Sequence, residues 1–503
     1  MSDTRLRYRL KYCLYEAAAF DAGSPGVHFL GHALKQKGVP YDYCITLPFK
    51  RYDVYFVSIM HYADYFMASK SFADLDRNDP LPIVIAGGHG YMLNPEPIAD
   101  LFDVVCIGEG ETWICKAVDI LEKCAGQSRH KVYDAFLELP GSYLPQVYRP
   151  QYNKHERLLK KPDFVVHRQH ESDIDKSPIY FNKSNTVNHA DTWYKEIARG
   201  CEYKCAYCEM GWNAPTRFAS KKSVINAIHS VDAKIAPKMN FFTSDATAYP
   251  EDYNSLVDEV KRCKMRVMFS SARLSTLRRH PMTSAHKSYL WRMGVDGLSE
   301  RIRQAVFKPC SNAEIFEFID KTAPHYFYKL FFVFSFPFEE KQDIMEFKAF
   351  IERLMRQRWN RKINIRIKCT AFIPQPGTPL QYASDMEYKH GQFLYRLLGR
   401  HEQIPGRSQQ RLMIDGITGR ISHTMSIVMA RGNRNLLRYI RPCRSLEELW
   451  NNLKKSDLNW KEWLSYSEDK EYWSYIRTCN SHLLKSAWQK VQHMVGRFSN
   501  KGK

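Results

Sequence analysis

Three cysteines stand close together in the stretch Cys201–Cys208, at spacings of four and three residues, directly after an apolar run. Thiolates are soft ligands that suit iron–sulfur clusters. A cluster of four irons needs four ligands, so a loop that supplies three leaves one iron open to a ligand that is not protein. The alternative is a zinc site, which usually combines C-x2-C pairs with a fourth Cys or His, and no such second pair stands nearby. The spacing therefore favours a four-iron cluster held by Cys201, Cys205 and Cys208.

Tyr207 immediately precedes the last cysteine, so the loop has the pattern C-x3-C-x-aromatic-C. This is the signature of the radical S-adenosylmethionine (SAM) enzymes, and the chain resembles that superfamily. In the family, SAM chelates the open iron through its amino and carboxylate groups. One electron from the cluster cleaves SAM to methionine and a 5′-deoxyadenosyl radical, which abstracts a hydrogen from the substrate. The resemblance implies a 4Fe-4S cluster, SAM as cofactor, and an electron donor such as flavodoxin or ferredoxin.

The bulk properties of the chain agree with such an enzyme. With 503 residues, 44% of them hydrophobic, the chain can form about three domains with sizeable cores. It shows no apolar run of membrane-spanning length and no secretory signal at its N-terminus. Its 13 cysteines are scattered and odd in number, which suits a reducing compartment. These features predict a cytoplasmic protein (in the host cytoplasm if it is viral) without a membrane partner.

Residues 1–125 alternate short apolar runs with helical patterns, which predicts a Rossmann-like parallel α/β sheet. Loops at Ser58–His61, at Gly87–Gly90 and at Asn94–Pro97 follow predicted strands. This succession is similar to the cobalamin-binding-type domain that precedes the barrel in many radical SAM enzymes. The Asp-x-His-x-x-Gly motif that supplies an axial histidine elsewhere is missing. Cobalamin binding therefore stays open beside the alternative, in which the fold is retained and the glycines serve only tight turns.

The remaining chain divides into three predicted parts. Residues 126–190 are turn-rich and polar, as expected of a connector, and residues 191–385 alternate strands and helices. The resemblance implies that this second part is a partial (β/α)6 radical SAM barrel. Residues 386–503 form a basic, Trp-rich, mainly helical extension, in which Arg431–Arg434 and the tryptophans also resemble the C-terminal region of cobalamin-type relatives. The predicted fold class is thus α/β with a helical C-terminal part.

The resemblance also places SAM-binding residues on predicted strand ends, because a barrel binds its ligand there. Ser244 and Asp245 stand where relatives have Gly-Gly-Glu, which binds the SAM amino group. Ser270 and Arg273 follow the next strand, where the SAM ribose and carboxylate are bound. Farther on, Asp296 replaces a usual Glu. The other implied SAM or cluster-neighbour positions are Tyr207, Ser299 and Arg301, with Arg303 as the next candidate for the carboxylate. The alternative for the arginine pair is a solvated helix face, and no catalytic residue is identified.

Charge suggests a class of substrate. The net charge is +20, and residues 391–503 hold 20 Lys/Arg against 9 Asp/Glu, a net of +11. Such a segment points to nucleic acid, although it could also be a solvated surface. The first hypothesis is a radical SAM enzyme that rearranges a substituent on a DNA base or nucleotide, for example N-linked to C-linked glycyl-thymidine. The alternatives are a cobalamin-dependent radical SAM methyltransferase acting on a small molecule or peptide, and a non-enzymatic protein with a structural cluster.

Overall fold

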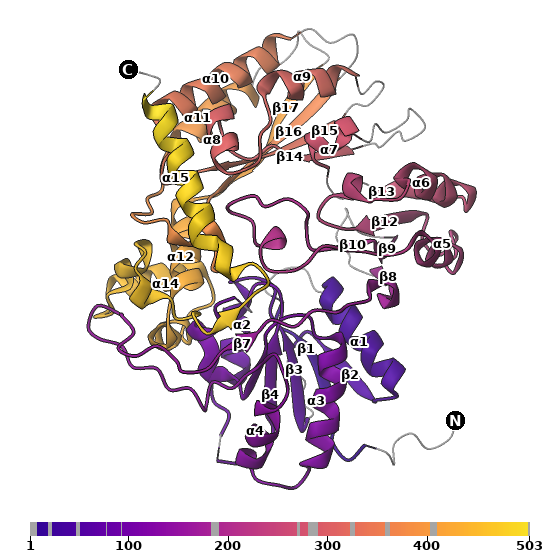
Figure 1. Cartoon of the computed structure of the whole chain (residues 1–503), viewed down its shortest axis with the longest axis vertical. Helices are drawn as coiled ribbons and strands as arrows, with labels where there is room; N and C mark the ends of the chain where they lie inside the picture. Colours follow the sequence, from indigo (N-terminus) through magenta and orange to yellow (C-terminus); the bar gives the residue numbers. More distant parts are fainter. Residues whose placement is uncertain are drawn as a thin grey trace. The chain divides into compact units, whose positions relative to one another are not determined.

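The computed structural model describes most of the chain as two compact units. The described residues are 8–18, 23–46, 51–76, 78–91, 93–182, 191–268, 272–279, 290–321, 327–357, 363–402 and 410–500. Unit 1 comprises Met1–Ser172, Lys183–Ala190 and Met425–Cys479, and unit 2 comprises Asp173–Asn182, Asp191–Thr424 and Asn480–Lys503. Each unit is described by itself (Figure 1).

Unit 1 begins with a doubly wound α/β domain. Its elements are β1 (Tyr12–Glu16), α1 (Pro25–Lys37), β2 (Tyr41–Cys44), β3 (Val54–Ser58), α2 (Asp64–Phe72), β4 (Ile83–Gly87), η2 (Glu96–Leu101), β5 (Val104–Cys106), α3 (Glu111–Lys123), α4 (Arg129–Leu137), β6 (Ser142–Tyr143) and β7 (Val166–His167). The sheet order is β2-β1-β3-β4-β5-β6, with only β6 antiparallel among the described strands. The prediction of a parallel α/β sheet is confirmed.

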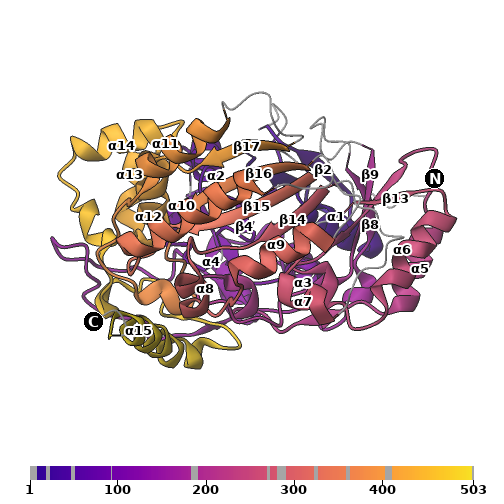
Figure 2. The same ribbon diagram turned by 90° about the horizontal axis from the view of Figure 1, so that it is seen from above.

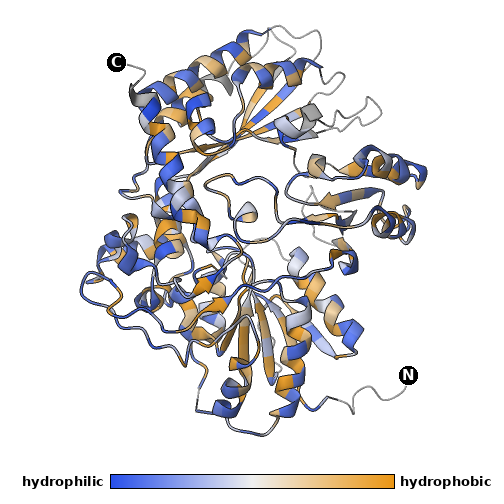
Figure 3. Cartoon of the chain, in the orientation of Figure 1, coloured by the Kyte–Doolittle hydropathy of each residue, from blue (hydrophilic) through white to orange (hydrophobic). Residues whose placement is uncertain are grey.

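The strands at the centre of this sheet are apolar on both faces. Every residue of β1 and of β3 is buried, as expected when helices cover both sides of a parallel sheet. Figure 3 shows these strands in the hydrophobic colour. The carboxyl ends of β1, β3 and β4 therefore meet at one edge, which is where open α/β sheets bind ligands.

Unit 1 also includes a C-terminal segment of short elements. These are η7 (Arg434–Leu436), α13 (Leu437–Ile440), α14 (Leu446–Lys454), η8 (Trp460–Leu464), η9 (Glu468–Lys470) and β18 (Ile476–Arg477), while the unit boundary falls within α12 (Arg420–Arg431). The residues expected as a single extension, 386–503, thus contribute to both units. Trp460, Trp463 and Trp473 are buried. They pack the interior of unit 1, so stacking on nucleic-acid bases is not their role.

Unit 2 carries alternating strands and helices. It contains η3 (Ile174–Lys176), β8 (Ile179–Asn182), β9 (Thr192–Glu196), β10 (Ala198–Arg199), η4 (Glu209–Gly211), β11 (Arg217–Phe218), α5 (Lys221–His229), β12 (Lys238–Phe242), η5 (Ala246–Ala248), α6 (Tyr253–Arg262), β13 (Arg266–Met268), α7 (Leu274–Arg279), β14 (Leu290–Gly294), α8 (Glu300–Ala305), α9 (Asn312–Lys321), β15 (Phe327–Phe334), α10 (Lys341–Arg356), β16 (Ile363–Ala371), η6 (Pro379–Tyr382), α11 (Gly391–Glu402), β17 (Gln410–Ile417), η10 (Ser481–Leu483) and α15 (Leu484–Asn500).

The strands of unit 2 form an open arc. One sheet has the order β13-β12-β9-β8, with β8 antiparallel, and the other has the all-parallel order β14-β15-β16-β17. A parallel bridge between Ala272 and Met293 links the two. Helices α9 and α10 cover the outside of the second sheet (Figure 2). The arrangement confirms a partial βα barrel, extended by β8 and β17 beyond the six predicted strands.

Among the helices in the described part of the chain, none combines the length and the apolar character that a membrane span requires.

Candidate functional site

The cysteine loop follows β9 and β10, at the carboxyl end of the first parallel strand of the arc. Its backbone is held from two sides at Ala206. The amide nitrogen of Ala206 donates to Val306 O at 3.0 Å, and its carbonyl oxygen accepts from Leu380 N at 3.1 Å. Trp212 Nε1 donates to Cys205 O at 2.9 Å. A Cβ on Gly211 would lie 1.9 Å from the carbonyl oxygen of Tyr203, so only glycine lets the loop close on itself. The loop is therefore a fixed scaffold for the three thiols.

The three thiols are partly or fully buried and lie close enough to influence one another. Burial raises the pKa of Cys201 and raises the pKa of Cys208 to about 12, and the neighbouring cysteines contribute to both shifts. Thiolates are soft ligands that suit an iron–sulfur cluster, in which each thiolate binds a separate iron. The loop therefore offers three sulfur ligands from one short segment.

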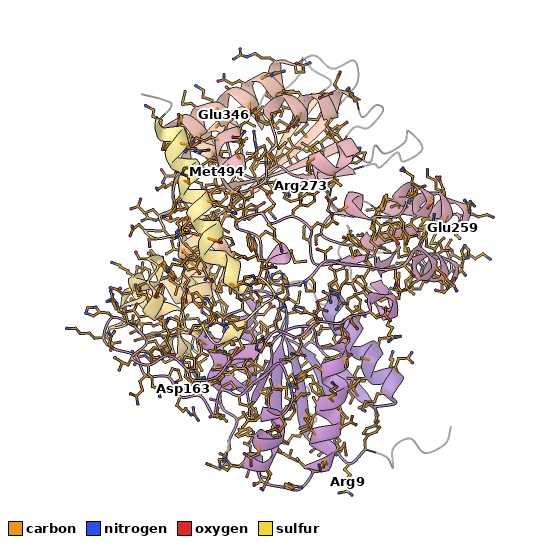
Figure 4. All side chains as sticks on the ribbon, in the orientation of Figure 1. Arg9, Asp163, Glu259, Arg273, Glu346 and Met494 are labelled. Atoms are coloured by element: carbon orange, nitrogen blue, oxygen red, sulfur yellow. The ribbon has the colours of Figure 1, made fainter. Side chains whose placement is uncertain are left out.

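Arg273 is the cation nearest to the thiols. Its Nη1 lies 3.3 Å from Cys205 Sγ, and its guanidinium stacks 3.8 Å from the centre of the Tyr203 ring. Figure 4 shows Arg273 beside the loop. The guanidinium therefore places a hydrogen-bond donor and a positive charge beside this sulfur. The structure thus shows Arg273 in contact with the cysteine loop. The sequence predicted that Arg273 binds SAM, and this contact stays a prediction.

Tyr207 connects the loop to the fourth strand of the arc. Its hydroxyl donates to Asp296 Oδ2 at 2.6 Å, and Lys308 forms an ion pair with the same carboxylate. Burial by itself would lower the pKa of Lys308, but the Asp296 charge raises it above its ordinary value. Burial and Asp296 together raise the pKa of Tyr207, which keeps its hydroxyl a donor. Tyr207 therefore fixes the loop to the ion pair between Asp296 and Lys308.

The predicted binders of the SAM amino group lie beside the same loop. Ser244 Oγ donates to Gly200 O at 2.6 Å, directly before Cys201. Asp245 Oδ2 accepts from Thr276 Oγ1 at 2.9 Å, and Thr276 is hydrogen-bonded to the Tyr203 hydroxyl at 2.6 Å. Asp245 and Arg273 thus come from neighbouring strand ends and both approach Tyr203. Ser270 lies outside the described residues.

Ser299 and Arg301 are engaged in a helix-capping network. Ser299 caps α8 by accepting from Ile302 N at 3.2 Å and donates to Asp343 Oδ1. Arg301 Nε donates to the same oxygen at 3.0 Å, and its Nη2 reaches Asp343 Oδ2. Arg303 is fully buried and donates to Asn312 Oδ1 at 2.7 Å. Because Arg303 is buried, it does not lie on a solvated helix face. Both arginines have partners within the protein, and binding of the SAM carboxylate by either of them stays a prediction.

Arg301→Ala separates the two roles of this arginine. The buried Asp343 would keep its bonds from Ser299 and Glu340 but lose its counter-ion, so we expect a loss of about 2–3 kcal/mol in unfolding free energy. Urea unfolding measures this, and SAM affinity is measured on the folded fraction. A variant with unchanged stability and weakened SAM binding would instead support the carboxylate grip.

Glu339 lies in the turn that follows β15. The turn begins at Ser335, whose φ of 62° lies in the left-handed region that favours glycine. Glu339 Oε2 accepts from Ser335 N at 2.8 Å, which braces the turn. Burial is the main cause that raises the pKa of Glu339 to about 8. The side chain is therefore a neutral acid below that pH.

This pKa predicts a pH dependence of stability. A carboxyl whose pKa is higher in the folded than in the unfolded protein stabilises the fold fully below its ordinary pKa of 4.5. The contribution is lost as pH rises toward about 8. Glu339→Gln should remove this slope and be more stable than the parent at pH 8, by about 1–3 kcal/mol. Urea unfolding at pH 5, 6.5 and 8 tests it; parallel curves for both proteins would contradict the assignment.

Helix α15 packs directly on the cluster loop. Trp212, Leu484 and Ala487 form one apolar cluster, and Asn480 Nδ2 donates to Trp212 O at 3.0 Å. The opposite face exposes Lys485, Lys490 and Arg497, and the helix contains no acidic residue. A basic surface is thereby attached to the segment that carries the thiols.

In unit 1, the glycines of the second loop serve packing between loops. A Cβ on Gly88 would lie 2.2 Å from Ile59 O, and one on Gly90 would lie 2.1 Å from Met60 O. The backbone of the loop after β3 thus occupies the space that a side chain at Gly88 or Gly90 would need. A Cβ at Gly87 would make only ordinary contacts. The loops still stand at the ligand-binding edge of the sheet, and Ser58 ends β3 there.

The sequence did not predict that residues Asn94–Pro97 bind residues of the C-terminal segment within unit 1. Asn94 Nδ2 donates to the carbonyls of Ala430 and Gly432, and Glu96 forms a buried ion pair with Arg434 at 2.8 Å. The signal was available as two unusual motifs, Asn94–Pro97 and Arg431–Arg434, but nothing local shows that they meet.

Comparisons with known proteins agree with this geometry. Residues 50–145 match the family model described as radical SAM proteins, N-terminal. An uncharacterized protein of Methanocaldococcus jannaschii is 26% identical over 442 residues, covering 85% of this chain and 88% of the relative. Among solved structures, the cobalamin-dependent SAM radical enzyme OxsB, with aqua-cobalamin and SAM bound, matches with a TM-score of 0.53 and 11% identity over 98% of this chain and 81% of its own.

A second solved structure has the same architecture. The radical SAM methyltransferase TsrM of Kitasatospora setae, with cobalamin and a [4Fe-4S] cluster bound, matches with a TM-score of 0.51 and 12% identity over 74% of each chain. At these identities the structural likeness concerns the fold. The chain is thus similar to radical SAM proteins in its N-terminal segment, and its fold is like that of two enzymes of that class that bind cobalamin.

Proposed function

We propose that the chain is a radical SAM enzyme in which Cys201, Cys205 and Cys208 hold a 4Fe-4S cluster. The observation that carries the proposal is the fixed loop of three thiols at the carboxyl end of β9, in which Arg273 donates to Cys205 and Tyr207 donates to Asp296. When bound, the cluster supplies the electron that splits SAM. Asp245 is the proposed acceptor for the SAM ammonium group, because it is an acidic side chain next to the loop.

The proposed substrate is a base in DNA or a nucleotide. The support is charge: Lys485, Lys490 and Arg497 are exposed on the helix that packs on the cluster loop. The reaction would rearrange a base substituent, as in conversion of N-linked to C-linked glycyl-thymidine. Hydrogen abstraction from the glycyl carbon gives 5′-deoxyadenosine and a radical that nitrogen and carbonyl both stabilise. Migration of the group and return of the hydrogen complete an isomerisation.

The second candidate is cobalamin-dependent methyl transfer to a small molecule or peptide. It is favoured by the N-terminal parallel sheet, whose carboxyl edge carries Ser58 and Gly87, and by the likeness in fold to TsrM. Cobalamin at this edge would supply a methyl carrier. Among the described residues at that edge, His61 is exposed after β3 and offers an imidazole, but its spacing is unlike the usual axial-histidine motif.

The salt dependence of DNA binding tests the nucleic-acid proposal. The triple variant Lys485→Gln, Lys490→Gln, Arg497→Gln should bind duplex and single-stranded DNA with a shallower dependence. The slope of log K against log salt should fall by about 2–3 if each cation contacts a phosphate of duplex DNA. The control, Lys116→Gln, Lys123→Gln, Lys131→Gln, removes the same charge from exposed positions in unit 1 and should keep the parent slope.

Three outcomes would decide between the candidates. Weak, salt-insensitive binding by the parent chain would reject nucleic acid as the substrate. Transfer of label from methyl-labelled SAM to a small acceptor, in a cobalamin-dependent manner, would establish the methyltransferase instead. Release of 5′-deoxyadenosine without methyl transfer would favour the rearrangement.

A further inference from the structure

We propose that His229, Glu259 and Cys263 form a second metal site, for Zn²⁺, that joins α5 to α6. The imidazole, carboxylate and thiol ligand atoms of these residues all lie within 4.8 Å of one another. His229 is the last residue of α5, and Cys263 follows the last residue of α6. Both helices run opposite to the strands, so this group lies at the amino-terminal rim of the arc. The cysteine loop is at the other rim.

The two helices fix the relative positions of the three side chains. Helices α5 and α6 are neighbours whose buried residues, among them Ile228 and Val260, join the core of unit 2. Glu259 and Cys263 are four residues apart, which places them on one face at the end of α6. Cys263 packs partly against the core, so its thiol is anchored. Figure 4 shows Glu259 on the outer side of unit 2, away from Arg273.

The donor set matches a borderline cation. Zn²⁺ takes histidine nitrogen, carboxylate oxygen and thiolate sulfur together, whereas Mg²⁺ and Ca²⁺ prefer oxygen alone. Three protein ligands leave the fourth tetrahedral position to water. A tetrahedral zinc needs ligand atoms about 3.3–3.8 Å apart, so only small side-chain movements separate the observed group from a bound state.

The electrostatics of the group are already suited to a cation. His229 Nε2 lies 2.7 Å from Glu259 Oε1, and Arg262 pairs with the same carboxylate. The Arg262 side chain is 69% exposed, so it can turn into water when a metal replaces it. His229 is also exposed, which gives the ion an open path.

A surface ion pair alone would account for only part of this arrangement. The His229 and Arg262 side chains are mostly exposed, so their pairing with Glu259 contributes little to stability. Such an ion pair needs no thiol nearby. The Cys263 thiol supplies the third ligand atom that a metal site requires. Zinc bound here would tie the ends of α5 and α6, and by binding only the folded chain it would stabilise unit 2.

The test uses the full chain, anaerobically reconstituted so that the cluster cysteines are occupied by iron. Zn²⁺ affinity is measured by competition with a chromophoric chelator, and zinc and iron are counted by elemental analysis after gel filtration. Cys263→Ser and His229→Gln remove ligands, while Cys479→Ser and His493→Gln alter an exposed thiol and an exposed imidazole elsewhere. Iron content, measured in every variant, keeps the outcome separate from that of the cluster proposal.

We expect one Zn²⁺ per chain in the parent and in both controls, because the control substitutions lie outside the group of three ligands. Each ligand variant should bind Zn²⁺ at least tenfold more weakly, since loss of an outer-shell partner alone costs about 10–100-fold. Zinc should also raise the unfolding temperature of the parent but not of the ligand variants. Equal zinc affinity in the parent, Cys263→Ser and His229→Gln would overturn the proposal.

Discussion

Replacing Cys201, Cys205 and Cys208 together by alanine should lower the bound iron from about four per chain to near zero and abolish SAM cleavage. The physical reason is that no other described cysteine belongs to this loop, whose backbone is held at Ala206 and Cys205 by three hydrogen bonds. Iron and sulfide analysis and release of 5′-deoxyadenosine after anaerobic reconstitution are the measurements.

Single variants sharpen this experiment. Cys205→Ala removes the thiol that receives the Arg273 contact and should behave like the triple variant. The matched control, Cys479→Ser, changes an exposed thiol outside the loop and should keep full iron and activity. If the triple variant retained iron and SAM cleavage, the cluster assignment and the proposed function would both fail.

Arg434→Ala should destabilise unit 1 by about 3–5 kcal/mol, the range for removing one partner of a buried ion pair. The guanidinium bonds to Glu96 at 2.8 Å, to Asp100 at 3.0 Å and to the carbonyl of Pro145 at 2.9 Å, and it also reaches the Tyr143 hydroxyl. The Glu96 side chain is fully buried, so its charge would be left without a cation. Urea unfolding followed by tryptophan fluorescence reports the loss.

The chemistry of the guanidinium predicts further outcomes. Arg434→Lys should recover little, because an ammonium cannot reproduce a planar set of donors to several acceptors. Arg438→Ala is the control: its pair with Asp457 is largely exposed, so this variant should keep the stability of the parent. Adding Glu96→Gln to Arg434→Ala should restore part of the stability. Additive losses in that double variant would contradict a direct coupling.

Much of the fold could be read from local patterns. The alternation of apolar runs and helical segments predicted the parallel sheet of unit 1. The helical pattern of residues 111–123 predicts a helix there, and α3 has these bounds. Strand ends are less accurate, because the apolar run of residues 8–15 predicts a strand whereas β1 spans Tyr12–Glu16. Apolar periodicity specifies which residues face a core, but the last backbone pair of a strand depends on its neighbours.

The site was predictable where its residues are adjacent in sequence. Spacing alone identified the three thiols and Tyr207, because a loop that binds a cluster must place its ligands within a few residues. The partners of the loop come from distant segments and could not be inferred as contacts. Asp296 and Lys308 were visible as charges, but only folding brings them to the Tyr207 hydroxyl.

The sequence by itself determined the chemistry on offer: three thiols in one loop, an aromatic before the last, and βα units whose strand ends face one rim. Tertiary structure alone decided how long-range polar groups are used. Arg301 pairs with Asp343, Arg434 pairs with Glu96, and Trp460, Trp463 and Trp473 are buried. The reason is that a buried charge must find its partner in another segment, 42 residues away for Arg301 and 338 for Arg434, and that choice depends on packing rather than on neighbouring sequence.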